Sequence, residues 1–177
     1  YYSLAGASQG TPCDPGTYNA QSGQIQCTSC PKGFYCPNQT MTTYEDCPTG
    51  SYCPASSSQP TPCPAGTFST SANLQNVSQC VTCTTGYYCS GTGNTAPTAG
   101  CAAGYYCVAG ASVSNPTDGV TGYSCPRGYY CPNTTNSPLP CPVGTYSNST
   151  GLTNASSCLT CTAGSYCDSL ARTTVSG

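Results

Sequence analysis

The chain has 177 residues, of which 18 are cysteine and only eight are charged, and its net charge is −2. Leu, Ile, Val and Phe together number 16, too few for a conventional hydrophobic core, yet the low net charge is unlike that of a disordered chain. Three basic residues leave no electrostatic footprint for nucleic acid. The composition is typical of a scaffold in which disulfide bonds replace the core.

One motif, Cys-x-x-Gly-x-(Tyr/Phe), recurs along the chain. Its nine copies begin at Cys13, Cys30, Cys47, Cys63, Cys83, Cys101, Cys125, Cys141 and Cys161. In six copies a second cysteine follows the aromatic residue directly: Cys36, Cys53, Cys89, Cys107, Cys131 and Cys167. In the other three copies a cysteine comes 14 or 17 residues after the first one and forms a Cys-x-x-Cys with the next copy: Cys27, Cys80 and Cys158. Every cysteine therefore belongs to the repeat.

Each copy has the composition of a turn that leads into a short strand. Glycine supplies a backbone conformation that other residues avoid, and the aromatic residue favours a strand in which its ring packs on a disulfide. The Ser-, Thr-, Asn-, Pro- and Gly-rich segments between copies are typical of surface loops, and helical periodicity is absent. We expect small disulfide-rich repeats forming an extended rod of short β-hairpin modules, with little or no helix and one aromatic ring at the core of each module.

A longer recurrence divides the chain into groups of motifs. Six cysteines between Cys47 and Cys89 recur between Cys125 and Cys167 with an offset of 78 residues. We predict repeat group 1 at residues 1–62, repeat group 2 at 63–140 with one extra motif copy, and repeat group 3 at 141–177, truncated by the end of the segment.

Five N-glycosylation sequons lie between the motifs. They begin at Asn38, Asn76, Asn133, Asn148 and Asn154. With the cysteine count they indicate a secreted or cell-surface protein that carries N-glycans, because disulfides persist in oxidising compartments. Pro-, Ser- and Thr-rich stretches such as residues 56–62 also suit O-linked sugar. No apolar run is long enough to predict a membrane span in this segment.

Catalytic and metal-binding functions lack the residues they need. The chain has no histidine and only five acidic and three basic residues, so we expect neither enzyme activity nor a cofactor. The Cys-x-x-Cys pairs have zinc-ligand spacing, but each belongs to the disulfide-type motif. A calcium site of the EGF type needs clustered acids before a cysteine, and only Glu45-Asp46 comes near it. A solvated turn is the simpler interpretation of this pair.

The pattern Cys-Pro-x-Gly-Thr-Tyr-Ser followed by Cys-x-x-Cys resembles the cysteine-rich repeats of ephrin-receptor-like and tumour-necrosis-factor-receptor-like modules, which are related in shape to EGF-like repeats. The resemblance runs through residues 13–36, 63–89 and 141–167. The interleaved copies at 30–37 and 125–132 are similar to long arrays on surface proteins of protists and algae, including flagellar hairs (mastigonemes). The resemblance implies three disulfides: Cys13–Cys27, Cys63–Cys80 and Cys141–Cys158.

The pairing of the other twelve cysteines stays open at the level of the sequence. One scheme closes each Cys-x-x-Gly-x-Tyr-Cys copy on itself, as in Cys30–Cys36. Another scheme crosses neighbouring copies, as in Cys30–Cys47, but it fails where three such copies follow one another from Cys83 onward. Terminal cysteines bridging to a following segment are a further option.

Two classes of function fit these observations. The first is a structural component of an extracellular glycosylated filament or cell-surface coat, which self-associates head to tail. The second is a ligand-binding receptor or adhesin ectodomain, which is expected to carry charged or apolar recognition patches. The monotonous modules and the few charged residues favour the structural role.

Overall fold

The computed structural model describes residues 1–3 and 10–177, which form two compact units. The first unit comprises residues 1–64, 68–81 and 92–96 within that range, and the second comprises residues 65–67, 82–91 and 97–177. Each unit is built from the same hairpin module, so one description serves for both.

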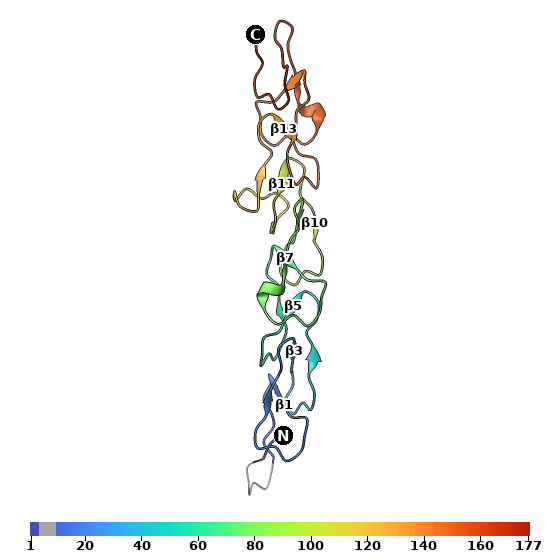
Figure 1. Ribbon diagram of the computed structural model, residues 1–177, viewed down its shortest axis with the longest axis vertical. Coiled ribbons are helices and arrows are strands. Elements are labelled where there is room, and N and C mark those ends of the chain that lie inside the picture. The colour runs from blue at the N-terminus through green and yellow to red at the C-terminus, as the bar shows by residue number, and fades with distance from the viewer. Residues whose placement is uncertain (4–9) are drawn as a thin grey trace. The chain divides into compact units, whose positions relative to one another are not determined.

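Sixteen short strands in the described residues form eight two-stranded sheets (Figure 1). The pairs are β1 (Thr17–Tyr18) with β2 (Thr28–Ser29), β3 (Phe34–Tyr35) with β4 (Glu45–Asp46), β5 (Ser51–Tyr52) with β6 (Thr61–Pro62), β7 (Thr67–Phe68) with β8 (Val81–Thr82), β9 (Tyr87–Tyr88) with β10 (Ala99–Gly100), β11 (Tyr105–Cys107) with β12 (Gly122–Ser124), β13 (Tyr129–Tyr130) with β14 (Leu139–Pro140), and β15 (Thr145–Tyr146) with β16 (Leu159–Thr160). The first strand of each pair holds the aromatic residue of one motif, and the second directly precedes the first cysteine of the next motif. Each hairpin therefore joins two consecutive motifs.

A tight turn directs each motif into its strand. In the first copy the Thr17 amide donates to the Asp14 carbonyl at 3.0 Å, and Gly16 between them has a φ of +87°. Pro15 and Gly16 occupy the second and third positions of this turn, as in a type II β-turn, which requires a positive φ at the third position. The prediction of a turn followed by a short strand is confirmed.

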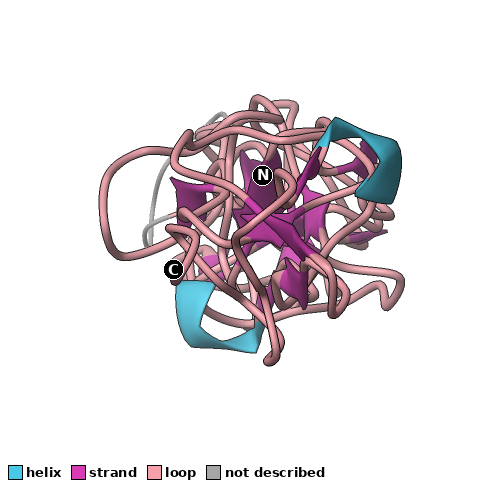
Figure 2. Ribbon diagram, turned by 90° about the horizontal axis from the view of Figure 1, so that it is seen from above, coloured by secondary structure: helices cyan, strands magenta, loops and turns pink. Residues whose placement is uncertain are grey.

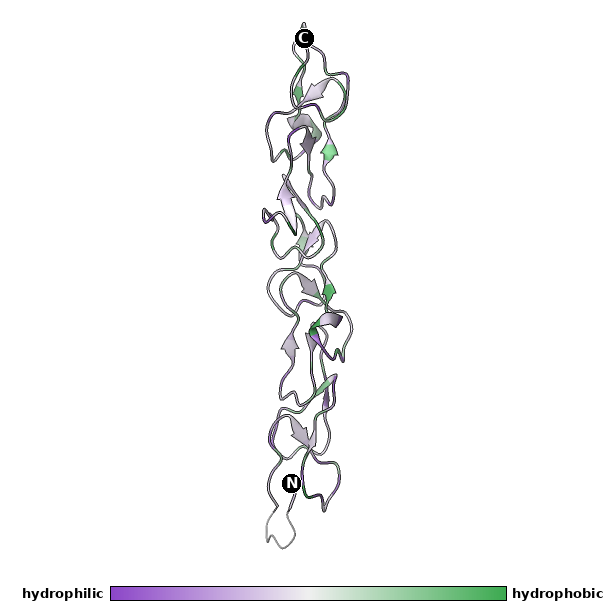
Figure 3. Ribbon diagram, turned by 60° about the vertical axis from the view of Figure 1, so that its left-hand side comes forward, coloured by the Kyte–Doolittle hydropathy of each residue, from purple (hydrophilic) through white to green (hydrophobic). Residues whose placement is uncertain are grey.

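Half-cystines occupy the centre of the modules. Sixteen of the eighteen cysteines are buried, and Cys27 and Cys161 are partly buried. In two clusters partly buried rings pack on the cystines: Tyr52 on Cys63, Leu74 and Cys80, and Tyr88 and Tyr105 on Cys101, Cys107 and Ala111. Because a two-residue strand cannot enclose a ring, the predicted aromatic core of each module is replaced by a sulfur core. Figure 3 accordingly shows hydrophobic residues at single positions and no continuous hydrophobic stripe within either unit.

The only helices in the described residues are two single 3-10 turns, drawn in cyan in Figure 2. They are η1 (Val77–Gln79), which directly precedes Cys80, and η2 (Ala155–Ser157), which directly precedes Cys158. The predicted fold class of small disulfide-rich hairpin modules with little helix is confirmed. The predicted group boundaries, which rest on sequence recurrence, stay a prediction.

Candidate functional site

Nine disulfide bonds join all the cysteines within the modules. They are Cys13–Cys27, Cys30–Cys36, Cys47–Cys53, Cys63–Cys80, Cys83–Cys89, Cys101–Cys107, Cys125–Cys131, Cys141–Cys158 and Cys161–Cys167. The three long bridges are those that the family resemblance implied. The other six follow the scheme in which each copy closes on itself, and neither the crossing scheme nor a bridge to a following segment is present. The turn at the motif glycine explains this pairing, because it returns the seventh residue of the motif to within about 6 Å of the first.

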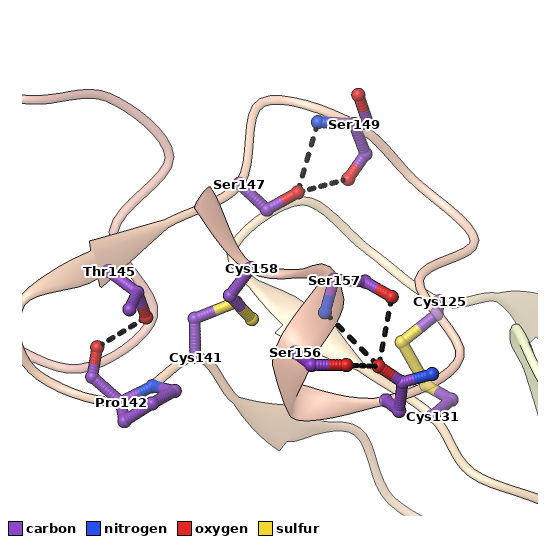
Figure 4. The surroundings of a disulfide bond; sticks show 11 residues. Cys125, Cys131, Cys141, Pro142, Thr145, Ser147, Ser149, Ser156, Ser157 and Cys158 are labelled. Atoms are coloured by element: carbon purple, nitrogen blue, oxygen red, sulfur yellow. Dashed lines mark hydrogen bonds between the residues drawn. A yellow bond between two sulfur atoms is a disulfide. The ribbon is translucent and has the colours of Figure 1, made fainter. Parts of the chain in front are cut away.

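Three motifs have Asn19, Ser69 or Ser147 at this seventh position in place of cysteine, and all three side chains are buried. The Ser147 hydroxyl donates to the Ser149 carbonyl at 3.0 Å and accepts from the Ser149 amide at 3.2 Å (Figure 4). Ser69 makes the same two bonds with Ser71, at 2.9 and 3.2 Å. A local hydrogen-bonded turn thus takes the place of the disulfide, which leaves the first cysteine free to form the long bridge.

Main-chain hydrogen bonds connect each motif to the next in an identical way. The amide of the motif glycine donates to the carbonyl of the seventh residue in the next motif, and its carbonyl accepts from the amide of that motif's first cysteine. For Gly33 these bonds reach Cys53 and Cys47, at 2.8 and 3.1 Å. The same pair of bonds occurs at eight junctions, beginning at Gly16, Gly33, Gly50, Gly66, Gly86, Gly104, Gly128 and Gly144.

The loop after each motif returns to the preceding motif through two further bonds. In the loop that contains Asn73, the Asn73 amide donates to the Cys47 carbonyl, and the carbonyl of the next residue, Leu74, accepts from the Cys53 amide; both distances are 2.8 Å. We call the residue that donates in this way the clamp residue. The eight clamp residues are Thr40, Ser56, Asn73, Gly93, Gly110, Thr134, Gly151 and Ala171, and all have a positive φ. Together these four bonds form a repeating ladder of main-chain contacts that is independent of side-chain identity.

Seven of the motif glycines also lie directly under the carbonyl of a clamp residue. A Cβ on Gly33 would stand 2.7 Å from the Asn73 carbonyl oxygen, and one on Gly104 would stand 2.7 Å from that of Gly151. Around Gly144 and Gly164, in contrast, nothing lies within 4 Å of a Cβ position. In most motifs glycine is therefore required for two reasons: its φ is positive, and the neighbouring loop approaches too closely to leave room for a Cβ.

All five sequon asparagines are exposed, but their surroundings differ. Asn76 and Asn154 are the N-caps of η1 and η2, and each side-chain oxygen accepts a bond from the serine hydroxyl two residues later, at 2.5 Å from Ser78 and 2.6 Å from Ser156. Figure 4 shows Ser156 and Ser157 bonded to one shared oxygen. Asn148 accepts from the Ser149 hydroxyl at 3.3 Å.

The other two sequons lie where loops contact the preceding motif. The Asn133 side-chain oxygen accepts from the Ala103 amide at 2.9 Å, and the sequon contains the clamp residue Thr134. The Asn38 sequon ends at the clamp residue Thr40. The sequence motif alone does not separate these two surroundings, because the clamp residues follow no residue type.

The long insert between Cys107 and Cys125 contains a hydrogen-bonded turn at Asp118, which the cysteine motif does not predict. The Asp118 carboxylate accepts from the amides of Val120, Thr121 and Gly122 and from the Thr121 hydroxyl, at 2.6 to 3.3 Å. The Thr121 hydroxyl bond, followed by the backbone bonds, lowers the pKa of Asp118 to about 2. The Asp118-Gly119 dipeptide is a turn signal, so the position of this turn, though not its bonding, is visible in the sequence.

The acidic pair considered for calcium lies on β4 and both side chains are exposed. The Asp46 carboxylate accepts from the Asn73 side-chain amide at 3.0 Å. The hydrogen bond with Glu45, with smaller contributions from burial and from the carboxylate charge, raises the pKa of Tyr35. Within the described residues no three His, Cys, Asp or Glu side chains come together as a metal-binding group. Asp46 thus bonds a neighbouring loop, and Glu45 bonds Tyr35 on the paired strand β3.

Comparison with known proteins identifies no relative of this chain. The chain matches no protein-family model and no curated protein sequence. Among the described residues, no helix has the length and apolar character that crossing a membrane requires. The cystines, the ladder and the sequons are the features of the chain that indicate a function.

Proposed function

We propose that the chain is a structural segment of an extracellular, glycosylated filament or cell-surface coat, in which disulfide-closed modules follow one another along the chain. The observation that carries this proposal is the main-chain ladder, which recurs unchanged at eight motif junctions. A contact made only by backbone groups permits the side chains to vary, so modules can be added without a new interface. Repetition of one contact is the requirement of a fibre and not of a reaction centre.

The cystines support a load-bearing role. Six of the nine disulfides close over a sequence separation of only six residues. A closed segment of that size contributes no extra contour length when the chain is pulled, whereas each free residue contributes up to about 3.5 Å. Together with the ladder, these short closed segments limit how far the array stretches under force.

The motif at Cys161–Cys167 supports head-to-tail association. Gly164 has the φ of a motif glycine, +88°, and the space beside it is open. At most other motifs this space is taken by the clamp carbonyl of a later loop. We propose that a module of the same motif from a second copy binds here, because the Gly164 amide and carbonyl have no ladder partner among the described residues.

Sequence chemistry supports the extracellular and glycosylated parts of the proposal. All cysteines are paired, which favours an oxidising compartment, and five exposed sequons offer sites for N-glycans. The Pro-, Ser- and Thr-rich loops suit O-linked sugar. The resemblance of the motifs to EGF-like, ephrin-receptor-like and flagellar-hair arrays favours the same role. The chain has few acidic and basic residues, and this shortage argues against enzyme activity.

Secretion of the protein from a eukaryotic host, followed by sedimentation analysis and electron microscopy, tests this proposal. We expect narrow particles that lengthen end to end with concentration, and a Gly164→Val variant that associates at least tenfold more weakly. Gly119→Val, which strains another positive-φ glycine, is the matched control and should associate normally. Globular monomers at all concentrations, or equal association of both variants, would contradict the proposal.

One observation favours a second candidate, a receptor or adhesin ectodomain. The insert between Cys107 and Cys125 interrupts the regular loop lengths and exposes Val113, Val120 and Tyr123, at 49%, 74% and 40% of their surfaces. A regular fibre has no need of such an apolar loop, whereas a recognition site has. Capture of a soluble protein ligand that is lost in the Val120→Ser variant would favour this candidate.

A further inference from the structure

The five sequons fall into two classes defined by the ladder. We call Asn38 and Asn133 the clamped sequons, because a clamp residue lies inside each of them, and Asn76, Asn148 and Asn154 the open sequons. We infer that the clamped sequons accept an N-glycan only before their loop has docked on the preceding motif, whereas the open sequons accept one before or after folding. This inference rests on the glycosylated, extracellular role proposed above.

The chemistry of the transfer makes both ends of the sequon necessary. The Asn Nδ2 attacks the anomeric carbon of a lipid-linked oligosaccharide diphosphate; a C–N bond forms, the sugar–phosphate bond breaks, and the amide gives up one proton as the lipid diphosphate leaves. The motif Asn-x-Ser/Thr specifies, besides the asparagine, only the hydroxyl two residues later. The transferase must therefore reach both the amide and this hydroxyl in one active site.

At Asn133 the folded protein withholds the second group. Thr135 is only 8% exposed, and its hydroxyl donates to the Pro132 carbonyl at 2.6 Å. The backbone on both sides is also fixed: the Thr134 amide donates to the Cys101 carbonyl at 2.9 Å, and the Cys107 amide donates to the Thr135 carbonyl at 3.1 Å. Release of this hydroxyl requires the loop to leave the Cys101–Cys107 module.

In the Asn38 sequon the clamp residue is the third residue of the sequon, whereas in the Asn133 sequon it is the second. Its hydroxyl residue, Thr40, is itself the clamp residue, with a φ of +64° and its amide donating to the Cys13 carbonyl at 3.1 Å. The next carbonyl, that of Met41, accepts from the Asn19 amide at 2.8 Å. The hydroxyl residue is therefore held on both sides by the first motif.

At the open sequons the asparagine and the hydroxyl residue are both exposed. The Ser78 and Ser156 hydroxyls already touch the side-chain oxygens of Asn76 and Asn154, at 2.5 and 2.6 Å. Those bonds use the oxygen of each amide. The Asn154 Nδ2 donates one hydrogen bond to the Thr153 hydroxyl at 3.2 Å, and its second N–H is the one that the sugar replaces. A glycan on Asn133 is equally compatible with the finished fold, because its bond from Ala103 also uses the oxygen.

A purified oligosaccharyltransferase with a lipid-linked oligosaccharide donor tests this inference on protein made without glycans. Site occupancy is measured by mass spectrometry of peptides from the oxidised and the reduced, denatured protein. We expect Asn76 and Asn154 to be modified in both states, and Asn133 to be modified at least tenfold more slowly in the oxidised state. Equal rates at Asn133 and Asn154 in the oxidised protein would overturn the inference.

A pair of variants separates docking from a general effect of folding. Cys101→Ala/Cys107→Ala loosens the module on which the Asn133 loop docks and should raise modification of Asn133 alone. Cys47→Ala/Cys53→Ala removes an equivalent disulfide that has no contact with that loop and should leave Asn133 slow. A similar rise in both variants would also overturn the inference. The readout is site occupancy, so absence of filaments would count against the proposed function without changing this result.

Discussion

Two consecutive motifs, at Cys125 and at Cys141, show two ways of closing one module (Figure 4). The first closes on itself through Cys125–Cys131, and the second has Ser147 at the equivalent position and bridges from Cys141 to Cys158. Both nevertheless receive the same ladder bonds, from Gly104 to Cys131 and from Gly128 to Ser147, at 2.8 and 3.0 Å. The disulfide pattern therefore varies while the backbone contact between motifs stays constant. The ladder is the feature that all the motif junctions share.

The largest effect should come from adding a side chain where the ladder brings two backbones together. Gly33 and Gly144 both have a φ of +85°, so an alanine at either position costs about 1 to 2 kcal/mol of backbone strain. Only at Gly33 does the new Cβ meet a clamp carbonyl, which adds about 1 to 3 kcal/mol of overpacking. Urea unfolding monitored by local hydrogen exchange should therefore rank Gly33→Ala well below Gly144→Ala in stability. Equal losses would mean that the clamp contact is unimportant.

The second-largest effect on stability should come from removing disulfides, and it should differ between the long and the short bridges. In the chain-entropy model, the long Cys63–Cys80 bridge constrains the unfolded chain by roughly 3 kcal/mol and the short Cys47–Cys53 bridge by roughly 2 kcal/mol. Paired substitution to alanine should lower local stability in that order. If the short bridge proves more important, the disulfides act mainly on the folded module, and the entropic comparison between the two closures is wrong.

The serine that replaces a cysteine gives a smaller effect. Ser147→Ala removes both bonds to Ser149 in a buried position and should cost about 1 to 2 kcal/mol. Ser149→Ala is the matched control, since its exposed hydroxyl makes only a 3.3 Å bond to Asn148. Thermal unfolding of the two variants should separate them, and an unchanged Ser147→Ala would show that the turn does not replace the disulfide.

The smallest effect concerns the insert, where Asp118 orders a loop outside the ladder. Its pKa is lowered to about 2 in the folded protein. A lowered pKa means that the carboxylate stabilises the fold above the ordinary Asp pKa, and that this contribution is lost as the pH falls toward about 2. A carbon NMR titration should show a midpoint near 2 and loosening of the insert below it. A midpoint at the ordinary value would exclude the four bonds to Asp118 in solution.

The sequence predicts the cystine framework better than it predicts the ladder. The family resemblance implies the bridges Cys13–Cys27, Cys63–Cys80 and Cys141–Cys158, and the sequence leaves self-closure as one of the open schemes for the other cysteines. The clamp residues leave no such signal, because Thr40 and Ala171 adopt a positive φ without being glycine. Their conformation is imposed by tertiary hydrogen bonds, which local propensity does not encode.

The aromatic residues show a second limit of sequence reasoning. Strong strand formers with large rings predict a core at the start of each strand. The motif aromatics do lie in the strands, but at the second residue and not at the first. Tyr52 and Tyr88 are only half-buried, however, and lie against cystines of the next module. The buried centre of each module is filled mainly by half-cystines, with small additions such as Leu74 and Ala111.

Hydrogen exchange at the motif glycines tests the ladder most directly, because each glycine amide reports one junction. In the oxidised protein we predict slow exchange at Gly33, Gly104 and the equivalent glycines up to Gly144, whose amides all donate to the next motif. Gly164 has the same turn conformation but no such acceptor among the described residues, and its amide should exchange quickly. Exchange at Gly33 and Gly104 as fast as at Gly164 would contradict the account.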